Sequence, residues 1–243
     1  MRAMILAAGL GTRLRPLTDD RPKALVEIAG QTMLEIALRR LISFEIREII
    51  VNVHHFADKV VEFLEKNNNF GIRIEVSREE ILLDTGGGLK KAAWFLQGEQ
   101  PFILHNVDVL STIDLERMVQ FHDDHQALST LAVQSRKSSR NLLFDDAGKL
   151  CGRRVGESAD EIVRLSTQLH ARAFGGVHVI SPRLLPRIAE EGVFSIITSY
   201  LHLAGAGENI VAFPADEYYW RDLGEPENVA QAARDVEQGL IAV

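Results

Sequence analysis

Residues 1–28 read MRAMILAAGLGTRLRPLTDDRPKALVEI, and they decide the fold because an apolar run at 4–8 leads directly into the glycine turn GLGTR at 9–13. The apolar run predicts a short buried strand. Glycine lets a turn adopt a positive φ and approach a ligand closely, and successive N–H groups in such a turn form a concave anion site. Arg13 and Lys23 add two full positive charges. A strand, a glycine turn and fixed cations together predict a phosphate-binding site.

The charge of this segment differs from that of the whole chain. The first 25 residues carry a net charge of +3, whereas the 243-residue chain carries −7. A local positive site in an acidic protein indicates a small anionic ligand. The acidic balance also argues against nucleic acid as a partner, because general nucleic-acid binding needs an extended basic face.

The composition is typical of a soluble globular protein, with 46% hydrophobic and 25% charged residues. No apolar run reaches membrane-spanning length, so we expect no membrane partner. The apolar N-terminal run is also too short for a signal peptide. Cys151 is the single cysteine, which excludes an internal disulfide and a cysteine-based zinc site. These features predict a cytoplasmic protein.

The glycine pattern departs from two common phosphate loops. No G-x-x-x-x-G-K-[ST] run occurs, which excludes a Walker loop. A dinucleotide-binding turn needs a third glycine for close helix–strand packing, and Leu14 stands at that position. A nicotinamide oxidoreductase would also need an acidic residue at the end of the second strand, where residues 51–54 read VNVH. That class stays only as an alternative.

The segments at 9–18 and 21–26, GLGTRLRPLT and RPKALV, resemble the signature of sugar-1-phosphate nucleotidyltransferases. The family pattern is G-x-G-T-R-L-x-P-L-T followed by P-K-P-L, and Ala24 replaces its second proline. The resemblance implies that Arg13 and Lys23 are catalytic. It also implies contacts to a nucleoside triphosphate from positions in or beside the loop, namely Leu6, Ala8, Gly9, Gly11, Thr12 and Arg13.

Two aspartates are candidate Mg²⁺ ligands. Asp108 follows an apolar strand, and ligands of open α/β sheets bind at the carboxyl ends of the strands. Carboxylates suit Mg²⁺, which bridges protein oxygen to substrate phosphate. The resemblance implies that Asp108 is the metal aspartate of the family, with Val107 where glycine is common, and that Asp222 in WRDLG is the second ligand. The alternatives are a strand-end cap for Asp108 and a helix N-cap for Asp222.

The segment at 84–88, DTGGG, offers a flat backbone surface to a base or ribose before a helix expected to begin near Leu89. It resembles the E-T-G-G-G segment of the family, which implies nucleotide contacts from Thr85 and Gly86, with Asn106 joining them. A carboxylate from this region, such as Glu79, would pair with guanine, and backbone contacts would accommodate uracil. The base therefore stays open between the two.

Gly175 and Gly176 resemble the glycine-containing segment that lines the sugar pocket in relatives. The E-K-P motif that contacts sugar in many relatives is not found in this sequence. Short relatives that make UDP-N-acetylmuramate also lack that motif and carry E-T-G-G-G. The resemblance therefore implies sugar contacts from Gly175 and Gly176 without identifying the sugar.

Alternating strand and helix patterns predict an α/β fold: a Rossmann-like, mostly parallel sheet with helices on both faces. The family resemblance implies the nucleotide-diphospho-sugar transferase type. We expect one domain over 1–243, with a nucleotide-binding half at 1–138 and a sugar-phosphate-binding half with a closing helix at 139–243. The predicted helices are 32–44, 57–66, 89–96, 114–125, 195–203, 225–238 and one starting at Pro182. The predicted strands are 48–53, 72–76, 102–110, 128–133, 174–180, 210–213 and 218–223, with a hairpin at 142–155.

The function implied by the resemblance is Mg²⁺-dependent transfer of a nucleotidyl group from UTP or GTP to a sugar 1-phosphate. The products are a nucleotide sugar and pyrophosphate. A catalytically silent relative that senses nucleotide sugars remains an alternative, because Val107 departs from the family pattern.

Overall fold

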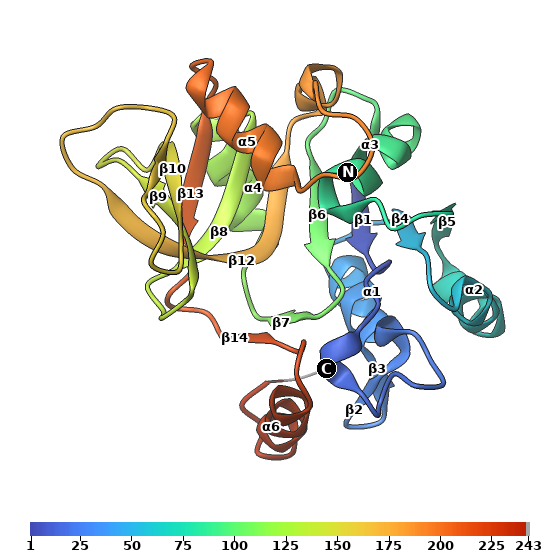
Figure 1. Cartoon of the computed structure of the whole chain (residues 1–243). Helices are drawn as coiled ribbons and strands as arrows, with labels where there is room; N and C mark the ends of the chain where they lie inside the picture. The colour runs from blue at the N-terminus through green and yellow to red at the C-terminus, as the bar shows by residue number, and fades with distance from the viewer. Residues whose placement is uncertain (242–243) are drawn as a thin grey trace.

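The computed structural model describes residues 1–241. Its first half forms the parallel part of the sheet, as predicted (Figure 1). Strand β1 (Arg2–Leu6) lies between β4 (Glu48–Val53) and β6 (Phe102–Asn106), and β5 (Arg73–Arg78) extends the sheet beyond β4. All three pairings are parallel.

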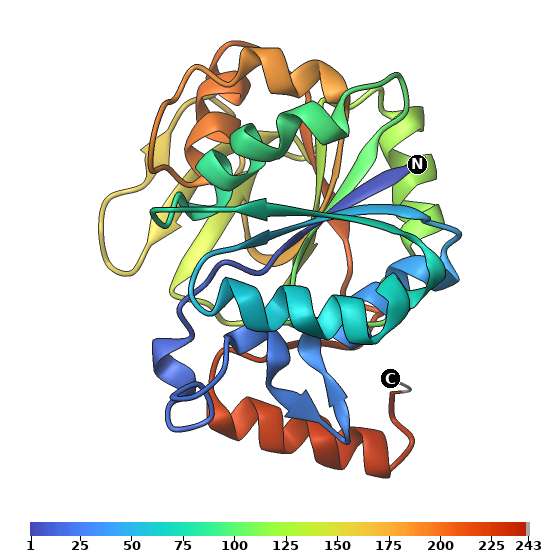
Figure 2. The same ribbon diagram turned by 90° about the vertical axis from the view of Figure 1, so that its right-hand side faces the viewer.

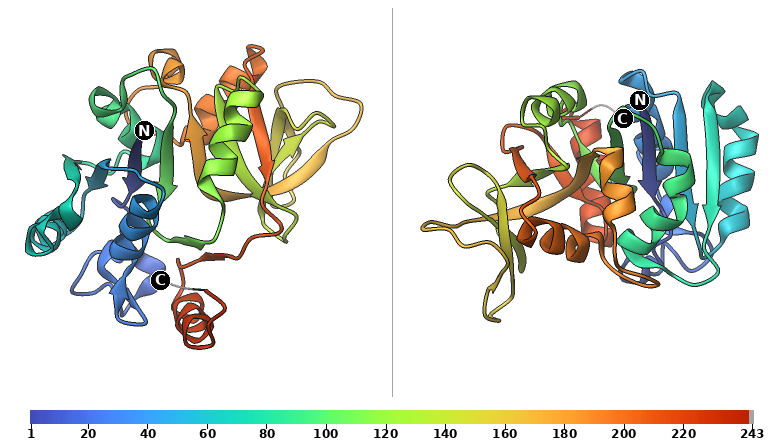
Figure 3. Two further views of the ribbon diagram at one scale, coloured as in Figure 1. Left: turned by 180° about the vertical axis from the view of Figure 1, so that it is seen from behind. Right: turned by 90° about the horizontal axis from the view of Figure 1, so that it is seen from above.

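The second half continues the same sheet with antiparallel strands. The long strand β12 (His170–Ile180) runs antiparallel to β6 and to β8 (Ser129–Gln134), and β13 (Ile210–Pro214) pairs in parallel with β8. A hairpin of β9 (Arg140–Phe144) and β10 (Leu150–Val155), with the short β11 (Glu161–Ile162), continues the sheet from β12. Figure 3 shows this hairpin projecting from the end of the sheet farthest from β5. One sheet therefore runs through both predicted halves.

Helices cover both faces of the sheet, which confirms the predicted layering (Figure 2). One apolar cluster includes buried residues of α1, α2, α4 and α6, and the other includes those of α3 and α5. The helices are α1 (Met33–Ser43), α2 (Ala57–Lys66), α3 (Asp84–Leu96), α4 (Leu115–Asp124), α5 (Ile196–Gly205) and α6 (Pro226–Glu237), and Pro182–Arg187 forms a 3₁₀ helix. Asp114 caps α4 as predicted, because its side chain accepts a 3.0 Å hydrogen bond from the Arg117 N–H.

Several predicted boundaries differ from the structure by a few residues, and two of the differences affect the site. The strand expected over 102–110 divides at Val107 and Asp108, and β7 (Val109–Ser111) turns away to pair with β14 (Trp220–Asp222). The division begins where the Val107 N–H makes a last 3.1 Å bond to the Leu6 carbonyl of β1.

The other difference is the start of α3, which lies at Asp84 and not near Leu89. The three glycines at 86–88 are therefore buried in the first turns of this helix. No helix within residues 1–241 has the length and apolar character needed to cross a membrane.

Candidate active site

The glycine turn, the end of β6 and the start of α3 meet at one edge of the sheet and enclose a cavity of about 360 Å³. We call it the loop cavity. The adjacent strands β1 and β6 contribute through their carboxyl ends, where α/β sheets bind ligands. The predicted residues that line it are Leu6, Ala8, Gly9, Lys23, Thr85, Asn106 and Asp108. The structure thus brings together most of the predicted nucleotide-binding set.

The glycine turn is held by its own hydrogen bonds. Gly11 has a φ of +65°, its carbonyl accepts a 2.9 Å bond from the Leu14 N–H, and the Thr18 hydroxyl donates to the same oxygen at 2.8 Å. Leu14 is fully buried in the apolar core, which explains why a third glycine is not needed at that position. Gly9 lines the cavity, and a Cβ added there would meet no protein atom within 4 Å.

Lys23 and Asp108 form an ion pair inside the loop cavity. The two side chains are largely buried, with exposed fractions of 12% and 17%. Lys23 comes from a short 3₁₀ helix after Pro22, and Asp108 comes from the turn between β6 and β7. Two predicted site residues that lie 85 positions apart in sequence are therefore in direct contact.

Asp222 lies next to Asp108 because β14 pairs with β7. Asp222 stands opposite Val109, and the Leu223 N–H donates a 2.8 Å bond to the Asp108 carbonyl. The Asp222 Oδ1 atom also accepts a 2.6 Å bond from the Gly224 N–H, so this carboxylate caps the turn before α6 as well.

The donor set fits Mg²⁺, which prefers hard oxygen ligands and usually retains water or substrate phosphate in its shell. Asp108, in the turn before β7, and Asp222, the last residue of β14, carry carboxylates on neighbouring segments. Within residues 1–241, no group of three or more metal-binding side chains is present. A cation here would therefore take two carboxylates from the protein and further oxygens from its substrates.

Arg13 points toward Asp222 and away from the loop cavity. Its Nη1 atom lies 3.2 Å from the Glu225 carboxylate, and its guanidinium borders a cavity of about 820 Å³ that Asp222 also lines. Gly224 makes this approach possible, because a Cβ there would lie 2.8 Å from the Arg13 Nη2 atom. Thr12 is exposed at the start of the 3₁₀ turn.

Asn52 and Glu79 line the loop cavity and form a buried network, although only Glu79 was expected at the site, as a carboxylate that would pair with guanine. The Asn52 amide accepts from the Ala7 N–H at 2.7 Å and donates to the Glu79 carboxylate at 2.7 Å. The other Glu79 oxygen accepts from the Leu83 N–H at 2.9 Å. Both oxygens of Glu79 therefore bind protein groups, and this carboxylate holds the glycine turn to α3.

The first turn of α3 is held by a segment from the second half of the chain. The N–H groups of Gly86 and Gly87 donate to the Phe194 carbonyl at 2.9 and 3.3 Å, and the Thr85 hydroxyl accepts from the Ile196 N–H at 3.0 Å. A Cβ on Gly86 would lie 2.9 Å from that same carbonyl oxygen. Thr85 lines the cavity, whereas the N–H of Gly86 is used within the protein.

A second cavity of about 600 Å³ adjoins the loop cavity and is bordered by the β9–β10 hairpin. We call it the hairpin cavity. Asp84, Thr85 and Asn106 line both cavities, so the two are continuous at this point. Other residues that line the hairpin cavity include Arg140, Leu142, Arg153, Val155, Phe174 and His178.

Gly175 and Gly176 bring β12 close to the shared wall of the two cavities. They lie at an irregularity in the pairing of β12 with β8, and Gly176 has a φ of +73°. A Cβ on Gly176 would lie 2.9 Å from the Asn106 amide and 2.8 Å from Val109. These glycines therefore allow close packing beneath the hairpin cavity, and Phe174 and His178 on either side of them line it.

The buried histidines near the site are held neutral. Burial lowers the pKa of His105 to about 4 and that of His178 to about 3, with smaller contributions from the nearby Arg40 and from the other histidine, respectively. His178 shares a 2.8 Å hydrogen bond with the Tyr200 hydroxyl. Neutral, buried imidazoles of this kind are structural and carry no charge to a ligand at neutral pH.

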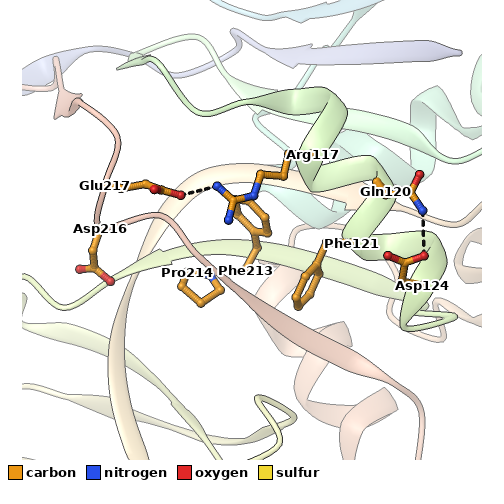
Figure 4. A pocket seen from close by; sticks show the side chains of 8 residues that line it. All are labelled: Arg117, Gln120, Phe121, Asp124, Phe213, Pro214, Asp216 and Glu217. Carbon is orange, nitrogen blue, oxygen red and sulfur yellow. Dashed lines mark hydrogen bonds and ion pairs between the residues drawn. The ribbon is translucent and has the colours of Figure 1, made fainter.

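A pocket of about 550 Å³ between α4 and the end of β13 with the residues that follow it is separate from these cavities (Figure 4). Four of its polar side chains bind one another, since Arg117 pairs with Glu217 at 2.5 Å and Gln120 donates to Asp124 at 2.7 Å. Asp216 accepts from the Ser135 N–H at 2.6 Å. Its lining contains none of the predicted site residues.

The site is that of an α/β protein in which a glycine turn lies beside a lysine and two carboxylates on neighbouring segments. Residues 2–142 match the family described as Nucleotidyl transferase. The chain therefore belongs to the nucleotidyl transferase family, and this confirms the family resemblance of residues 9–26.

Curated relatives extend the match over most of the chain. An N-acetylmuramate alpha-1-phosphate uridylyltransferase of Caulobacter vibrioides is 36% identical over 93% of this chain and 92% of its own length. A mannose-1-phosphate guanylyltransferase catalytic subunit beta of Drosophila pseudoobscura pseudoobscura is 30% identical over 93% of this chain. The chain spans only 60% of that longer relative.

Solved structures share the fold. HddC from Yersinia pseudotuberculosis, complexed with GMP-PN, has a TM-score of 0.77 at 21% identity, with 97% of this chain and 99% of that chain covered. The inositol-1-phosphate CTP transferase from T. maritima has a TM-score of 0.76 at 15% identity, with 99% and 98% covered. These likenesses confirm the nucleotide-diphospho-sugar transferase fold.

Proposed function

We propose that this chain is a Mg²⁺-dependent sugar-1-phosphate nucleotidyltransferase that uses UTP or GTP and releases pyrophosphate. The observation that carries the proposal is the ion pair of Lys23 with Asp108 inside the loop cavity, with Asp222 on the segment that lies beside Asp108. Family membership supports the reaction class. The uridylyltransferase from Caulobacter favours UTP as the first donor to test, because it matches over nearly its whole length.

The reaction needs charge stabilisation and no general base. An anionic phosphate oxygen of the sugar 1-phosphate attacks the α-phosphorus, a P–O bond forms, and the bond to pyrophosphate breaks. Two anions must meet, and charge builds on the leaving group, so positioned cations supply the catalysis. Lys23 neutralises the reacting phosphates, and the backbone of the glycine turn holds the triphosphate. Arg13 borders the neighbouring cavity with Asp222, so in this proposal it meets the outer phosphates where they extend beyond the loop cavity.

The two aspartates would hold Mg²⁺ between the protein and the triphosphate. When bound, Mg²⁺ neutralises phosphate charge and orients the triphosphate. Asp108 already faces one cation, Lys23, which is largely buried with it. In our proposal Lys23 turns to the phosphates when they enter.

The two cavities correspond to the two substrates in this proposal. The nucleoside triphosphate occupies the loop cavity, formed mainly by the 1–138 half, and the sugar phosphate occupies the hairpin cavity, formed mainly by the 139–243 half. Asn106 and Thr85 lie where the two substrates would meet, since both residues line both cavities.

Pyrophosphate release tests the proposal directly. Purified protein is incubated with UTP or GTP and a panel of sugar 1-phosphates, with Mg²⁺ or with EDTA. We expect Mg²⁺-dependent release of pyrophosphate with at least one pair. Nucleotide binding without release from any pair would support a silent, nucleotide-sugar-sensing relative and contradict the proposed activity. Family membership leaves a nicotinamide oxidoreductase without support.

A Gly9→Ala substitution is expected to weaken nucleotide binding without weakening the fold. The added methyl group meets no protein atom within 4 Å but enters the loop cavity. We expect the Tm to change by less than about 2 °C and the affinity for the triphosphate to fall about tenfold or more. Thermal unfolding and isothermal titration calorimetry measure the two effects.

Gly11→Ala is the matched comparison. It places a side chain at a φ of +65° and brings a Cβ to 3.0 Å from Lys23 and Thr18 side-chain atoms. The expected loss of stability is about 1–2 kcal/mol. If the nucleotide affinity of Gly9→Ala is unchanged, the proposed position of the triphosphate in the loop cavity is wrong.

A further inference from the structure

The hairpin cavity is lined by one arginine, Arg140, that no carboxylate within residues 1–241 neutralises, and a neutral sugar would leave this charge unused. Three arginines line it, Arg140, Arg153 and Arg154, against a single lining carboxylate, Asp84. Glu161 pairs with Arg153 and Asp160 pairs with Arg154, so Arg140 carries the charge that is left over within residues 1–241. Lys23 and Arg13, which serve the phosphates in the proposed reaction, are not among the residues that line this cavity.

Two of these arginines project from the same face of the hairpin. Arg140 stands opposite Val155, and Leu142 stands opposite Arg153, in the antiparallel register of β9 and β10. Directly opposite residues of an antiparallel pair lie on the same face, and so do residues two apart on one strand. Arg140 and Arg153 are therefore diagonal neighbours, and both side chains can reach the same ligand. Like charges placed this way repel unless an anion lies between them.

The guanidinium groups differ in how far they are already satisfied. Arg140 makes no side-chain hydrogen bond or ion pair within residues 1–241. Arg153 uses only its Nε atom, at 2.6 Å from the Glu161 carboxylate. Arg154 is bound at two points by Asp160, at 2.7 and 2.8 Å. Arg140 and the terminal nitrogens of Arg153 are therefore free to bind an anion, whereas the fork of Arg154 is filled.

We infer that Arg140 and Arg153 form a subsite for a carboxylate carried by the acceptor sugar, in addition to its 1-phosphate. The planar fork of arginine matches the two oxygens of a carboxylate, and such charge-assisted bonds give both affinity and selectivity. Leu142 and Val155 on the same hairpin face offer apolar contact to a short carbon substituent that bears the carboxylate. The inference rests on the proposed function, because it assigns the acceptor to the hairpin cavity.

Two acceptors that differ only in the carboxylate substituent test the subsite. N-acetylmuramate α-1-phosphate carries a lactyl ether with a carboxylate, and N-acetylglucosamine 1-phosphate has the same ring without it. We expect the wild-type protein to favour the carboxylate acceptor in kcat/KM by about 10- to 100-fold. The methyl ester of the lactyl group should lose most of that preference, because it keeps the size and removes the charge.

Arg140→Gln and Arg153→Gln are each expected to lower kcat/KM for the carboxylate acceptor about tenfold or more. The value for N-acetylglucosamine 1-phosphate should stay within about twofold, because the lost group serves only the carboxylate. Arg154→Gln is the matched control, because like Arg153→Gln it removes an ion pair of β10. The Arg154 guanidinium already donates two hydrogen bonds to Asp160, so it is not expected to bind the substrate carboxylate. Arg154→Gln should leave the ratio of kcat/KM for the two acceptors unchanged. Circular dichroism checks the fold of all three variants.

The outcomes separate the subsite from the reaction itself. Equal losses on both acceptors would mean that the arginines bind the 1-phosphate or support the hairpin, and this would overturn the inference. Equal use of both acceptors by the wild-type protein would also overturn it while the proposed function stands. Release of pyrophosphate from no acceptor would refute the proposed function. Calorimetric binding of the carboxylate acceptor, lost in Arg153→Gln, would still support the subsite in that case.

Discussion

Asp108→Asn is expected to lower kcat for pyrophosphate release by about 100- to 1,000-fold. The Asp108 carboxylate faces Lys23 and is the proposed ligand of Mg²⁺, so the neutral amide removes a charge on which both depend. Asparagine has nearly the same shape, and the 2.8 Å bond from the Leu223 N–H goes to the backbone carbonyl, which the change leaves in place. The fold should therefore persist, as thermal unfolding will show.

Lys23→Ala is the companion variant and is expected to cause a loss of similar size. It removes the cation that meets the reacting phosphates and leaves the largely buried Asp108 without its partner. Arg21→Ala is the control, because Arg21 is a nearby basic residue that pairs only with the adjacent Asp20. A turnover close to wild type in either Asp108→Asn or Lys23→Ala would contradict the proposed mechanism.

Calorimetry with UTP, in Mg²⁺ or in EDTA, tells whether Asp108→Asn is inactive because it no longer holds the cation or because it no longer binds the nucleotide. If Asp108 holds the cation, Asp108→Asn should lose the part of the UTP affinity that depends on Mg²⁺. Affinity measured in EDTA should change much less, since the backbone of the glycine turn is untouched. An unchanged effect of Mg²⁺ on affinity in Asp108→Asn would place the cation elsewhere.

The glycine turn could be predicted from the sequence because its determinants are local. The positive φ of Gly11 and the buried side chain of Leu14 depend on the residues beside them. The same reasoning correctly predicted α1, α2 and α4, whose apolar residues recur at helical spacing and, for α4, follow a capping aspartate.

The neighbouring positions of Asp108 and Asp222 could not be worked out from spacing. They meet because β7 leaves the main sheet and pairs with β14, a contact between segments more than 100 positions apart. Resemblance to a family was the only signal for Asp222 as a partner. The structure also shows that its carboxylate caps the turn at Gly224, so the alternative role is present together with the proposed one.

The start of α3 was predicted wrongly for a physical reason. Glycine disfavours helix, so three glycines at 86–88 predicted a loop. The Phe194 carbonyl accepts from two N–H groups of this turn and holds it helical, and a Cβ on Gly86 or Gly87 would collide with this segment. Tertiary contacts therefore override the local propensity.

Asn52 was missed, and Glu79 was expected to pair with guanine, because the role of each residue depends on a partner strand. The available signal was a polar residue near the carboxyl end of a strand. Asn52 is the second-last residue of β4, and Glu79 directly follows β5. Burial of the pair with mutual hydrogen bonds becomes visible only when the parallel register is known.

Acid is expected to destabilise the protein steeply below about pH 6.5, because three buried histidines must gain protons. Burial lowers the pKa of His105 and His122 to about 4 and that of His178 to about 3. The unfolded chain binds these protons near pH 6.5, whereas the folded chain does not until about pH 4. Stability is therefore complete above pH 6.5 and falls as the pH drops toward 4, by about 1.4 kcal/mol per pH unit for each histidine.

Urea unfolding between about pH 7 and about pH 5 measures this slope, in a range where carboxylates contribute little. His122→Gln, which removes a buried side chain near the C-terminal end of α4, should flatten the slope by about 1 kcal/mol per pH unit averaged over this range. His125→Gln is the control, because His125 lies three residues further on and is exposed. The His122 side chain shares a 3.0 Å hydrogen bond with Thr130, so the variant should also be less stable at neutral pH. An unaltered slope in His122→Gln would show that His122 takes up its proton equally in both states, and that its burial does not control the acid sensitivity.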